Sequence, residues 1–211
     1  MADVNPQTHW EQIYGTRSPA ERSWWQQQPE QSLRLLRRAG LSSRSRVIDV
    51  GGGDSVLVDA LLDIGVECVT VLDISRTALE GARARLGERA ARVAWLEGDA
   101  TSKPLHPMAY DIWHDRVTFH FLTDPLQRQG YLAALARALV PGGHVMMATF
   151  APDAPPRCSG LDVVRYGPED LAAELGSSFE LVDRMHHVHA TPSGERQPLS
   201  YALFRARNLE R

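Results

Sequence analysis

The sequence predicts an α/β fold in which a mostly parallel sheet has helices on both faces. Short β-branched runs alternate with helical segments between residues 46 and 150, which is typical of a doubly wound parallel sheet. The last two strand-like runs, 179–186 and 199–206, are separated by the turn-forming residues 192–194. This pattern indicates an antiparallel hairpin at one end of the sheet.

The individual elements follow from local patterns. Five short apolar runs, each bounded by turn-forming residues, are expected to be strands at 46–50, 69–72, 93–96, 111–114 and 144–150. Five segments with apolar residues at helical spacing are expected to be helices at 29–39, 56–64, 75–86, 126–139 and 168–175. Gly40 and Gly65 are typical stop signals, Ser75 is a typical N-cap, and Pro141-Gly142-Gly143 is expected to end the fourth helix.

The composition excludes several classes of protein. Hydrophobic residues make up 43% and charged residues 23% of the 211 residues, as in ordinary globular chains. A formal charge of -3 provides no basic excess for binding nucleic acid or an anionic membrane. Two cysteines, without a CxxC pair, indicate neither a disulfide framework nor a zinc site. Since no signal-like or membrane-spanning apolar run is visible, we expect a cytoplasmic protein. We expect it to be a monomer or a homodimer.

A single domain over residues 1–211 accounts for this pattern. We expect an N-terminal aromatic-rich cap and helix over 1–40 and a cofactor-binding half over 41–150. An acceptor loop, a helix and the hairpin complete the domain over 151–211.

A glycine-rich turn follows the first expected strand and is the most informative segment. In VIDVGGGDS, residues 47–55, a strand leads through three glycines into a helix. Glycine tolerates positive φ and allows close approach of a ligand. The carboxyl end of the first strand in such a sheet is a ligand-binding position.

Two classes of cofactor compete for this turn. A dinucleotide site requires GxGxxG, and Val56 stands at the third glycine position. Asp49 and Asp54 would repel a pyrophosphate but favour a cation such as the sulfonium and amino group of S-adenosylmethionine. Asp73, 22 residues after Gly51, is suitably spaced to accept both ribose hydroxyls of either nucleotide.

The chain resembles the class I S-adenosylmethionine-dependent methyltransferases over about residues 9–206. The resemblance is carried by VIDVGGGDS at 47–55, VLDIS at 71–75, EGDA at 97–100, DIWHDR at 111–116 and LVPGGHVMMATF at 139–150. It implies a Rossmann-like sheet of seven strands whose last two form the antiparallel hairpin. It also implies S-adenosylmethionine as cofactor and S-adenosylhomocysteine as product.

The resemblance further implies a set of cofactor-binding residues. Asp49 and the glycine turn would border the methionine part, Asp73 the ribose, and Asp99 with Ala100 the adenine. The full expected set is Asp49, Gly51, Gly52, Gly53, Ser55, Asp73, Ile74, Asp99, Ala100, Trp10, Tyr14 and Trp25. Ser55 stands where many members have a further glycine. The aromatic residues near the N-terminus are either a lid that excludes water or simply core.

The acceptor is expected beside the end of the fourth strand, at WHDRVTFHF, residues 113–121. This segment resembles the D-K/R-G-T segment of lysine methyltransferases that act on elongation factors and citrate synthase, although Val117 and His120 depart from it. Candidate catalytic residues are Asp115, His120, His114 and Arg116, and candidate substrate residues are Trp24, Phe119, Arg165 and Cys158. Arg165 could bind an acceptor carboxylate.

Simpler roles are equally compatible with this segment. Asp115 and Arg116 could form an ion pair that only braces the loop. His120 could be a packed histidine with a backbone partner. The histidines at 186, 187 and 189 lack an acid or cysteine at ligand spacing, so we expect no metal.

These observations favour methyl transfer to a small-molecule acceptor, with a thiol or a related soft nucleophile as the best candidate. A thiol ionises with little help, whereas a lysine amine must first lose its proton. Protein lysine methylation, a non-catalytic nucleotide-binding module and a nicotinamide-dependent oxidoreductase remain as alternatives.

Overall fold

The main sheet has the arrangement that the sequence predicts. In this computed structural model, which describes residues 5–207, seven strands are ordered β3-β2-β1-β4-β5-β9-β8. Neighbouring strands are parallel from β3 to β5, whereas β9 is antiparallel to both β5 and β8. The predicted parallel sheet with a terminal antiparallel hairpin is therefore confirmed. The strands are β1 Arg46–Val50, β2 Cys68–Asp73, β3 Val93–Glu97, β4 Tyr110–Arg116, β5 Leu139–Phe150, β8 Phe179–Ala190 and β9 Arg196–Ala206.

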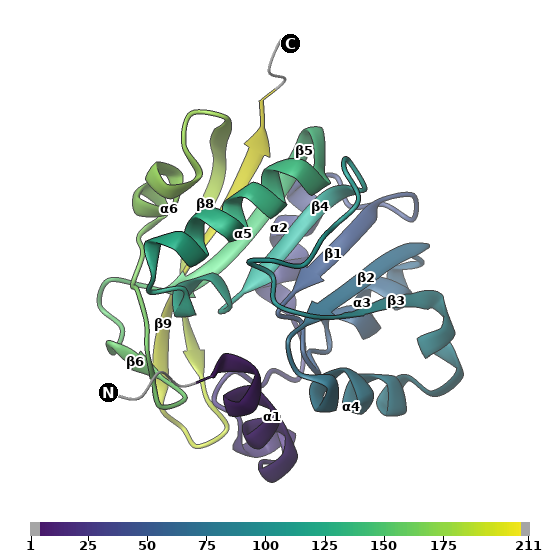
Figure 1. Cartoon of the computed structure of the whole chain (residues 1–211), viewed down its shortest axis with the longest axis vertical. Coiled ribbons are helices and arrows are strands. Elements are labelled where there is room, and N and C mark those ends of the chain that lie inside the picture. Colours follow the sequence, from purple (N-terminus) through teal and green to yellow (C-terminus); the bar gives the residue numbers. More distant parts are fainter. Residues whose placement is uncertain (1–4, 208–211) are drawn as a thin grey trace.

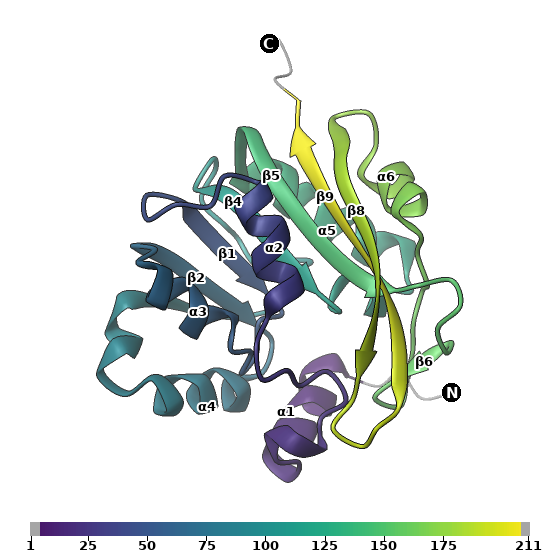
Figure 2. The ribbon, with the colours of Figure 1, turned by 180° about the vertical axis from the view of Figure 1, so that it is seen from behind.

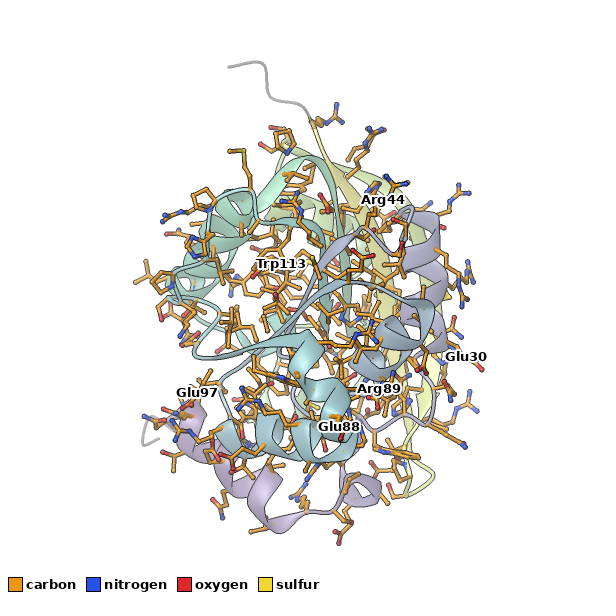
Figure 3. All side chains as sticks on the ribbon, turned by 90° about the vertical axis from the view of Figure 1, so that its right-hand side faces the viewer. Glu30, Arg44, Glu88, Arg89, Glu97 and Trp113 are labelled. Carbon is orange, nitrogen blue, oxygen red and sulfur yellow. The ribbon has the colours of Figure 1, made fainter. Side chains whose placement is uncertain are left out.

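Helices cover both faces of this sheet, as Figures 1 and 2 show from opposite sides. In β1, Val47 packs into a core with residues of α2, α3 and α4, whereas Ile48 and Val50 pack into a second core with α5 and α6. Successive strand residues point to opposite faces, so a strand buried on both faces is a nearly continuous apolar run, which only Asp49 interrupts in residues 47–50 of β1. Trp113 of β4 is fully buried and lies in the middle of the molecule, whereas Glu30 lies at its margin (Figure 3). The helices are α2 Glu30–Arg38, α3 Leu57–Ile64, α4 Arg76–Leu86, α5 Pro125–Ala138 and α6 Pro168–Leu175.

The predicted start of α4 and the predicted end of α3 are confirmed by their capping residues. The Ser75 hydroxyl accepts a hydrogen bond from the backbone N–H of Ala78 at 3.1 Å, so Ser75 is the N-cap of α4. Gly65 ends α3 in the left-handed conformation, with φ of 90°.

The predicted boundary between α5 and β5 is wrong. β5 begins at Leu139 rather than at residue 144, and Pro141-Gly142-Gly143 lies inside it. Leu139 pairs with Tyr110 and His144 with Ile112, so the register shifts between these pairs. Such an irregularity accommodates the tripeptide within the strand. The hairpin strands β8 and β9 also extend further toward their turn than predicted.

The N-terminal segment forms a helix that the sequence did not indicate. α1, Pro6–Thr16, is capped by the Asn5 side chain, which accepts a hydrogen bond from the Thr8 N–H at 3.1 Å. A short 3-10 turn, η1, follows at Pro19–Glu21. In Figures 1 and 2, α1 lies across the edge of the sheet at which the parallel strands end. The expectation that the aromatic segment packs against the domain is therefore confirmed.

Short elements complete the described part of the chain. The Pro-rich loop after β5 contains a small ribbon made of β6, Arg157–Cys158, and β7, Leu161–Asp162. Two further 3-10 turns are η2, Gly87–Arg92, and η3, Phe119–Phe121. Among residues 5–207, every helix is too short or too polar to cross a bilayer. Residues 1–4 and 208–211 of the single domain expected over 1–211 lie outside the described residues.

Candidate active site

A large cavity opens at the carboxyl end of the parallel strands. It has a volume of about 740 Å³ and is bordered by the glycine turn, by the ends of β2 and β4, and by α1. Most of the expected site residues line it, namely Trp10, Tyr14, Trp24, Asp49, Gly51, Gly52, Ser55, Asp73, Ile74, Asp99, Ala100, His114, Arg116 and Cys158. The other expected residues are Gly53, Trp25, Asp115, Phe119, His120 and Arg165, and they are absent from this lining.

The glycine turn requires glycine at its first and third positions. Gly51 and Gly53 have φ of 63° and 52°, in the left-handed region that L side chains rarely adopt. A Cβ on Gly51 would overlap the Thr118 side chain, and one on Gly53 would overlap the Tyr14 hydroxyl. Gly53 therefore lies directly against Tyr14 of α1.

Asp49 has one fixed and one free oxygen. Its Oδ1 lies 2.6 Å from Nδ1 of His114, which is the partner residue on neighbouring β4. Nε2 of His114 lies 2.8 Å from the Ser32 hydroxyl. The Oδ2 atom of Asp49 is buried and has no partner. A buried carboxylate oxygen without a donor is destabilising until a ligand supplies one.

Asp73 ends β2 and is almost completely buried. One oxygen accepts a hydrogen bond from the Ser75 N–H at 2.8 Å. Burial, reinforced by the charges of Asp49 and Asp54, raises the pKa of Asp73 to about 7. A site with this concentration of carboxylates favours hydroxyl donors or cations as ligands.

The Asp54 carboxylate differs from those of Asp49 and Asp73 because an arginine side chain is paired with it. It forms an ion pair with Arg22, in which Arg22 is buried and Asp54 is partly buried, and the Arg22 side chain also lies 4.6 Å from the centre of the Tyr14 ring. The interpretation that Asp54 faces the ligand is therefore wrong, because an N-terminal arginine neutralises it. The sequence offered no signal for Arg22, which lies in a polar segment far from the motif.

The segment after β4 is braced by Asp115. This fully buried carboxylate accepts hydrogen bonds from the Thr118 N–H at 3.0 Å and the Phe119 N–H at 3.1 Å. It also accepts one from the Tyr131 hydroxyl at 2.5 Å. Burial raises its pKa to about 6. Asp115 therefore holds the loop through hydrogen bonds, and the alternative of an ion pair with Arg116 is wrong.

His120 is a packed core histidine. It is fully buried, and its Nδ1 accepts a hydrogen bond from the Phe150 N–H at 3.2 Å. Burial lowers its pKa to about 3, so it stays neutral. The structure does not bring it to the cavity, which removes it as a candidate base.

Phe119 and Arg165, which were expected to contact the acceptor, make other contacts instead. Phe119 is fully buried against Tyr131 and Tyr166, with ring centres 5.0 and 5.6 Å away. Arg165 donates hydrogen bonds to the backbone oxygens of Pro152 and Ala154, both at 3.1 Å.

Aromatic side chains form one wall of the cavity, and Tyr14 joins this wall to the glycine turn. The ring centre of Trp10 lies 5.0 Å from that of Phe121 and 5.6 Å from that of Trp24, and Tyr14 lies 5.8 Å from Trp24. Trp25 is 37% exposed and is absent from the wall. Phe121 was not among the expected residues, although its place beside Phe119 in an aromatic segment was a signal for it.

A match to a known domain covers the glycine turn and the four parallel strands from β1 to β4. Residues 47–143 match the family model described as a methyltransferase domain. Residues 47–143 of the chain therefore belong to the methyltransferase domain family. S-adenosylmethionine is the cofactor of this family.

Relatives with a named function are methyltransferases with different acceptors. The ubiquinone biosynthesis O-methyltransferase of Photorhabdus laumondii is 31% identical over 116 residues, which are 54% of this chain and 47% of that protein. The eEF1A lysine and N-terminal methyltransferase of Danio rerio is 26% identical over 146 residues, which are 68% of this chain and 21% of that protein. The chain thus spans less than half the length of either relative.

Solved methyltransferase structures share the fold over nearly the whole chain. The N-methyltransferase NodS from Bradyrhizobium japonicum, crystallised with S-adenosylhomocysteine, superimposes with a TM-score of 0.71 at 19% identity. The match covers 93% of this chain and 97% of that one.

The residues that line the cavity fit the family cofactor. The unpartnered Oδ2 of Asp49 suits a cationic amino group, and the buried carboxylate of Asp73 suits hydroxyl donors. A Cβ on Gly52 would lie 2.7 Å from Asp49 Oδ2, so only glycine leaves room beside that oxygen.

Proposed function

We propose that this protein transfers a methyl group from S-adenosylmethionine to a small-molecule acceptor, with a thiol or a related soft nucleophile as the best candidate. The cofactor, when bound, supplies a methyl group activated by a sulfonium. The acceptor's sulfur forms a bond to this carbon, and the electron pair of the broken bond remains with S-adenosylhomocysteine. Atoms and charge balance without a further reactant when the acceptor is a thiolate.

We assign the cofactor-binding roles to the residues at the strand ends. Asp49 would accept hydrogen bonds from the amino group, and Asp73 from the ribose hydroxyls. Asp99 and Ala100 would border the adenine. The glycine turn, with Ser55 and Ile74 nearby, would border the rest of the cofactor.

The hydrogen bonding of His114 is the observation that favours an acceptor that can ionise without a protein base. His114 is the only histidine that lines the cavity within residues 5–207, and both of its ring nitrogens have partners at 2.6 and 2.8 Å. It therefore orients Asp49 and is not free to remove a proton from an acceptor. A thiol, with an ordinary pKa of about 8.5, needs this help far less than an amine near 10.4. The aromatic wall adds a polarisable, water-poor surface that suits sulfur.

A protein lysine acceptor is the second candidate, because a relative carries that activity in its name. The same cavity argues against it, since a lysine ammonium would need a free base to deprotonate it.

Methyl transfer from labelled S-adenosylmethionine tests the proposal. The purified protein is incubated with a thiol series, a phenol and a dialysed lysate, and label is counted separately in small-molecule and protein fractions. We expect label in thioether products, at a rate that rises with pH toward the thiol pKa. Label in the protein fraction alone would support the lysine candidate. Binding of S-adenosylhomocysteine without any product would support a non-catalytic module, and binding of NAD alone an oxidoreductase.

A further inference from the structure

Arg116 stands at the carboxyl end of β4 and lines the cavity. Its Nη1 donates a hydrogen bond to the Trp24 backbone oxygen at 2.9 Å, and its Nε donates one to the Tyr201 hydroxyl at 3.3 Å. Its Nη2 is buried and has no partner. The guanidinium therefore retains unused donors next to the aromatic wall.

The positive charge of Arg116 has no carboxylate within 4.0 Å among residues 5–207. Two other arginines near this end of the sheet are paired, Arg22 with Asp54 and Arg76 with Glu97. Within residues 5–207, Arg116 forms no such pair, and the oxygens of neighbouring Asp115 are occupied by backbone N–H groups and a tyrosine hydroxyl.

The surrounding groups respond to this charge. Burial first, and then the positive charge of Arg116, lower the pKa of His120 to about 3 and that of His189 to about 4. Both histidines are neutral at pH 7 and cannot compensate a cation. An unpaired guanidinium in a partly desolvated site is costly until an anion approaches it.

We propose that Arg116 binds an anionic group of the acceptor, so that the methyl acceptor is a small molecule carrying a carboxylate. This inference rests on the proposed function and deepens it. A planar guanidinium pairs with a carboxylate through two parallel hydrogen bonds, which fixes orientation as well as affinity. The sequence had suggested Arg165 for this task, but Arg165 does not line the cavity, and its Nη1 donates to two backbone oxygens elsewhere.

The position of Arg116 suits an acceptor site rather than a cofactor site. Residues 114 and 116 are two positions apart on β4, so their side chains point to the same face of the sheet. The His114 side chain contacts Asp49, which we assign to binding the cofactor. Arg116 instead contacts Trp24 and Tyr201, which belong to the N-terminal segment and β9. A carboxylate held there would place the rest of the acceptor among the aromatic side chains.

Calorimetric binding of two matched probes tests this inference without requiring turnover. Benzoate and benzyl alcohol are titrated into the protein saturated with S-adenosylhomocysteine, for wild type, Arg116→Gln, Arg116→Lys and Arg137→Gln. Arg137 is exposed on α5 and is the matched control. We expect wild type and Arg137→Gln to bind benzoate about 10- to 100-fold more tightly than benzyl alcohol, as expected for a charge-assisted pair. Arg116→Gln should lose this preference, and Arg116→Lys should keep part of it.

The preference is a ratio within one variant, so a general loss of stability does not imitate it. Equal binding of the two probes by wild type, binding of neither, or an unchanged preference in Arg116→Gln would overturn the inference. If Arg116→Gln fails to fold, the wild-type ratio and the Lys variant still decide it. Failure of wild type to bind S-adenosylhomocysteine at all would instead overturn the proposed function.

Discussion

Replacement of Asp49 by asparagine isolates the charge that we assign to binding the cofactor's amino group. Asparagine keeps the size of the side chain and an oxygen that can accept from His114, whose Nδ1 lies 2.6 Å from the carboxylate. It removes the negative charge and changes the free Oδ2, which is buried without a partner. A hydrogen bond to a charged group contributes about 1.5–3 kcal/mol. We therefore expect Asp49→Asn to weaken binding of S-adenosylhomocysteine by about 10- to 150-fold.

The assay compares two ligands that differ only in the part that Asp49 would contact. Calorimetry is performed with S-adenosylhomocysteine and with 5′-methylthioadenosine, which lacks the amino and carboxyl groups. Binding of methylthioadenosine should change less than about twofold, because no charge-assisted hydrogen bond is lost. Ser32→Ala is the matched control, since it removes a partner of His114 at 2.8 Å but leaves the Asp49 charge. Equal weakening of both ligands by Asp49→Asn would show a structural effect and refute the assignment.

Three further predictions concern the glycine turn, the N-terminal contact and pH. Gly51→Ala should lower the midpoint of thermal unfolding and abolish cofactor binding, because its Cβ would overlap a threonine side chain. Gly40→Ala is the control: Gly40 also has positive φ but has open space around it, so this variant should cost only about 1–2 kcal/mol of backbone strain. Arg22→Met should destabilise the protein by about 1.5–3 kcal/mol in urea unfolding, since it leaves the partly buried Asp54 charge unpaired. Adding Asp54→Leu should restore most of the loss, and no recovery in the double variant would contradict this. Because burial raises the pKa of Asp73 to about 7, the folded protein without ligand retains this proton that the unfolded chain has lost, so stability falls as pH rises from 5 to 8. Asp73→Asn should reduce that fall in urea unfolding by roughly 2 kcal/mol, and an unchanged pH slope would refute the assignment.

A contact between α1 and α4, like the Arg22–Asp54 ion pair, attaches the N-terminal segment to the rest of the domain. Glu11 of α1 accepts a hydrogen bond from the Arg76 N–H at 2.5 Å, at the first turn of α4, where a carboxylate is favoured by the helix dipole. The N-terminal segment is thus attached on both sides of the glycine turn. This attachment positions Tyr14 over Gly53 and closes one side of the cavity.

The sequence by itself determined the elements whose signals are local. The bounds of β1 and α6 were predicted without error, and Ser75 and Gly65 cap their helices as expected. The glycine turn and the acids at the strand ends could also be placed, because parallel strands bring their carboxyl ends to one edge. Most of the residues that line the cavity around the glycine turn were therefore predictable from short motifs.

Tertiary structure alone decided which of the charged and aromatic residues face the cavity. His120 and Arg116 stand four residues apart in the sequence, yet one is sealed in the core and the other lines the cavity with free donors. Arg22 neutralises Asp54 across 32 residues of sequence, and Ser32 reaches His114 across 82. Such pairings depend on long-range packing, which fixes burial and hydrogen-bond partners, and no local pattern encodes them. The residues around the glycine turn could thus be predicted from their motifs, whereas the exposure and pairing of His114, Arg116 and His120 emerged only from the folded chain.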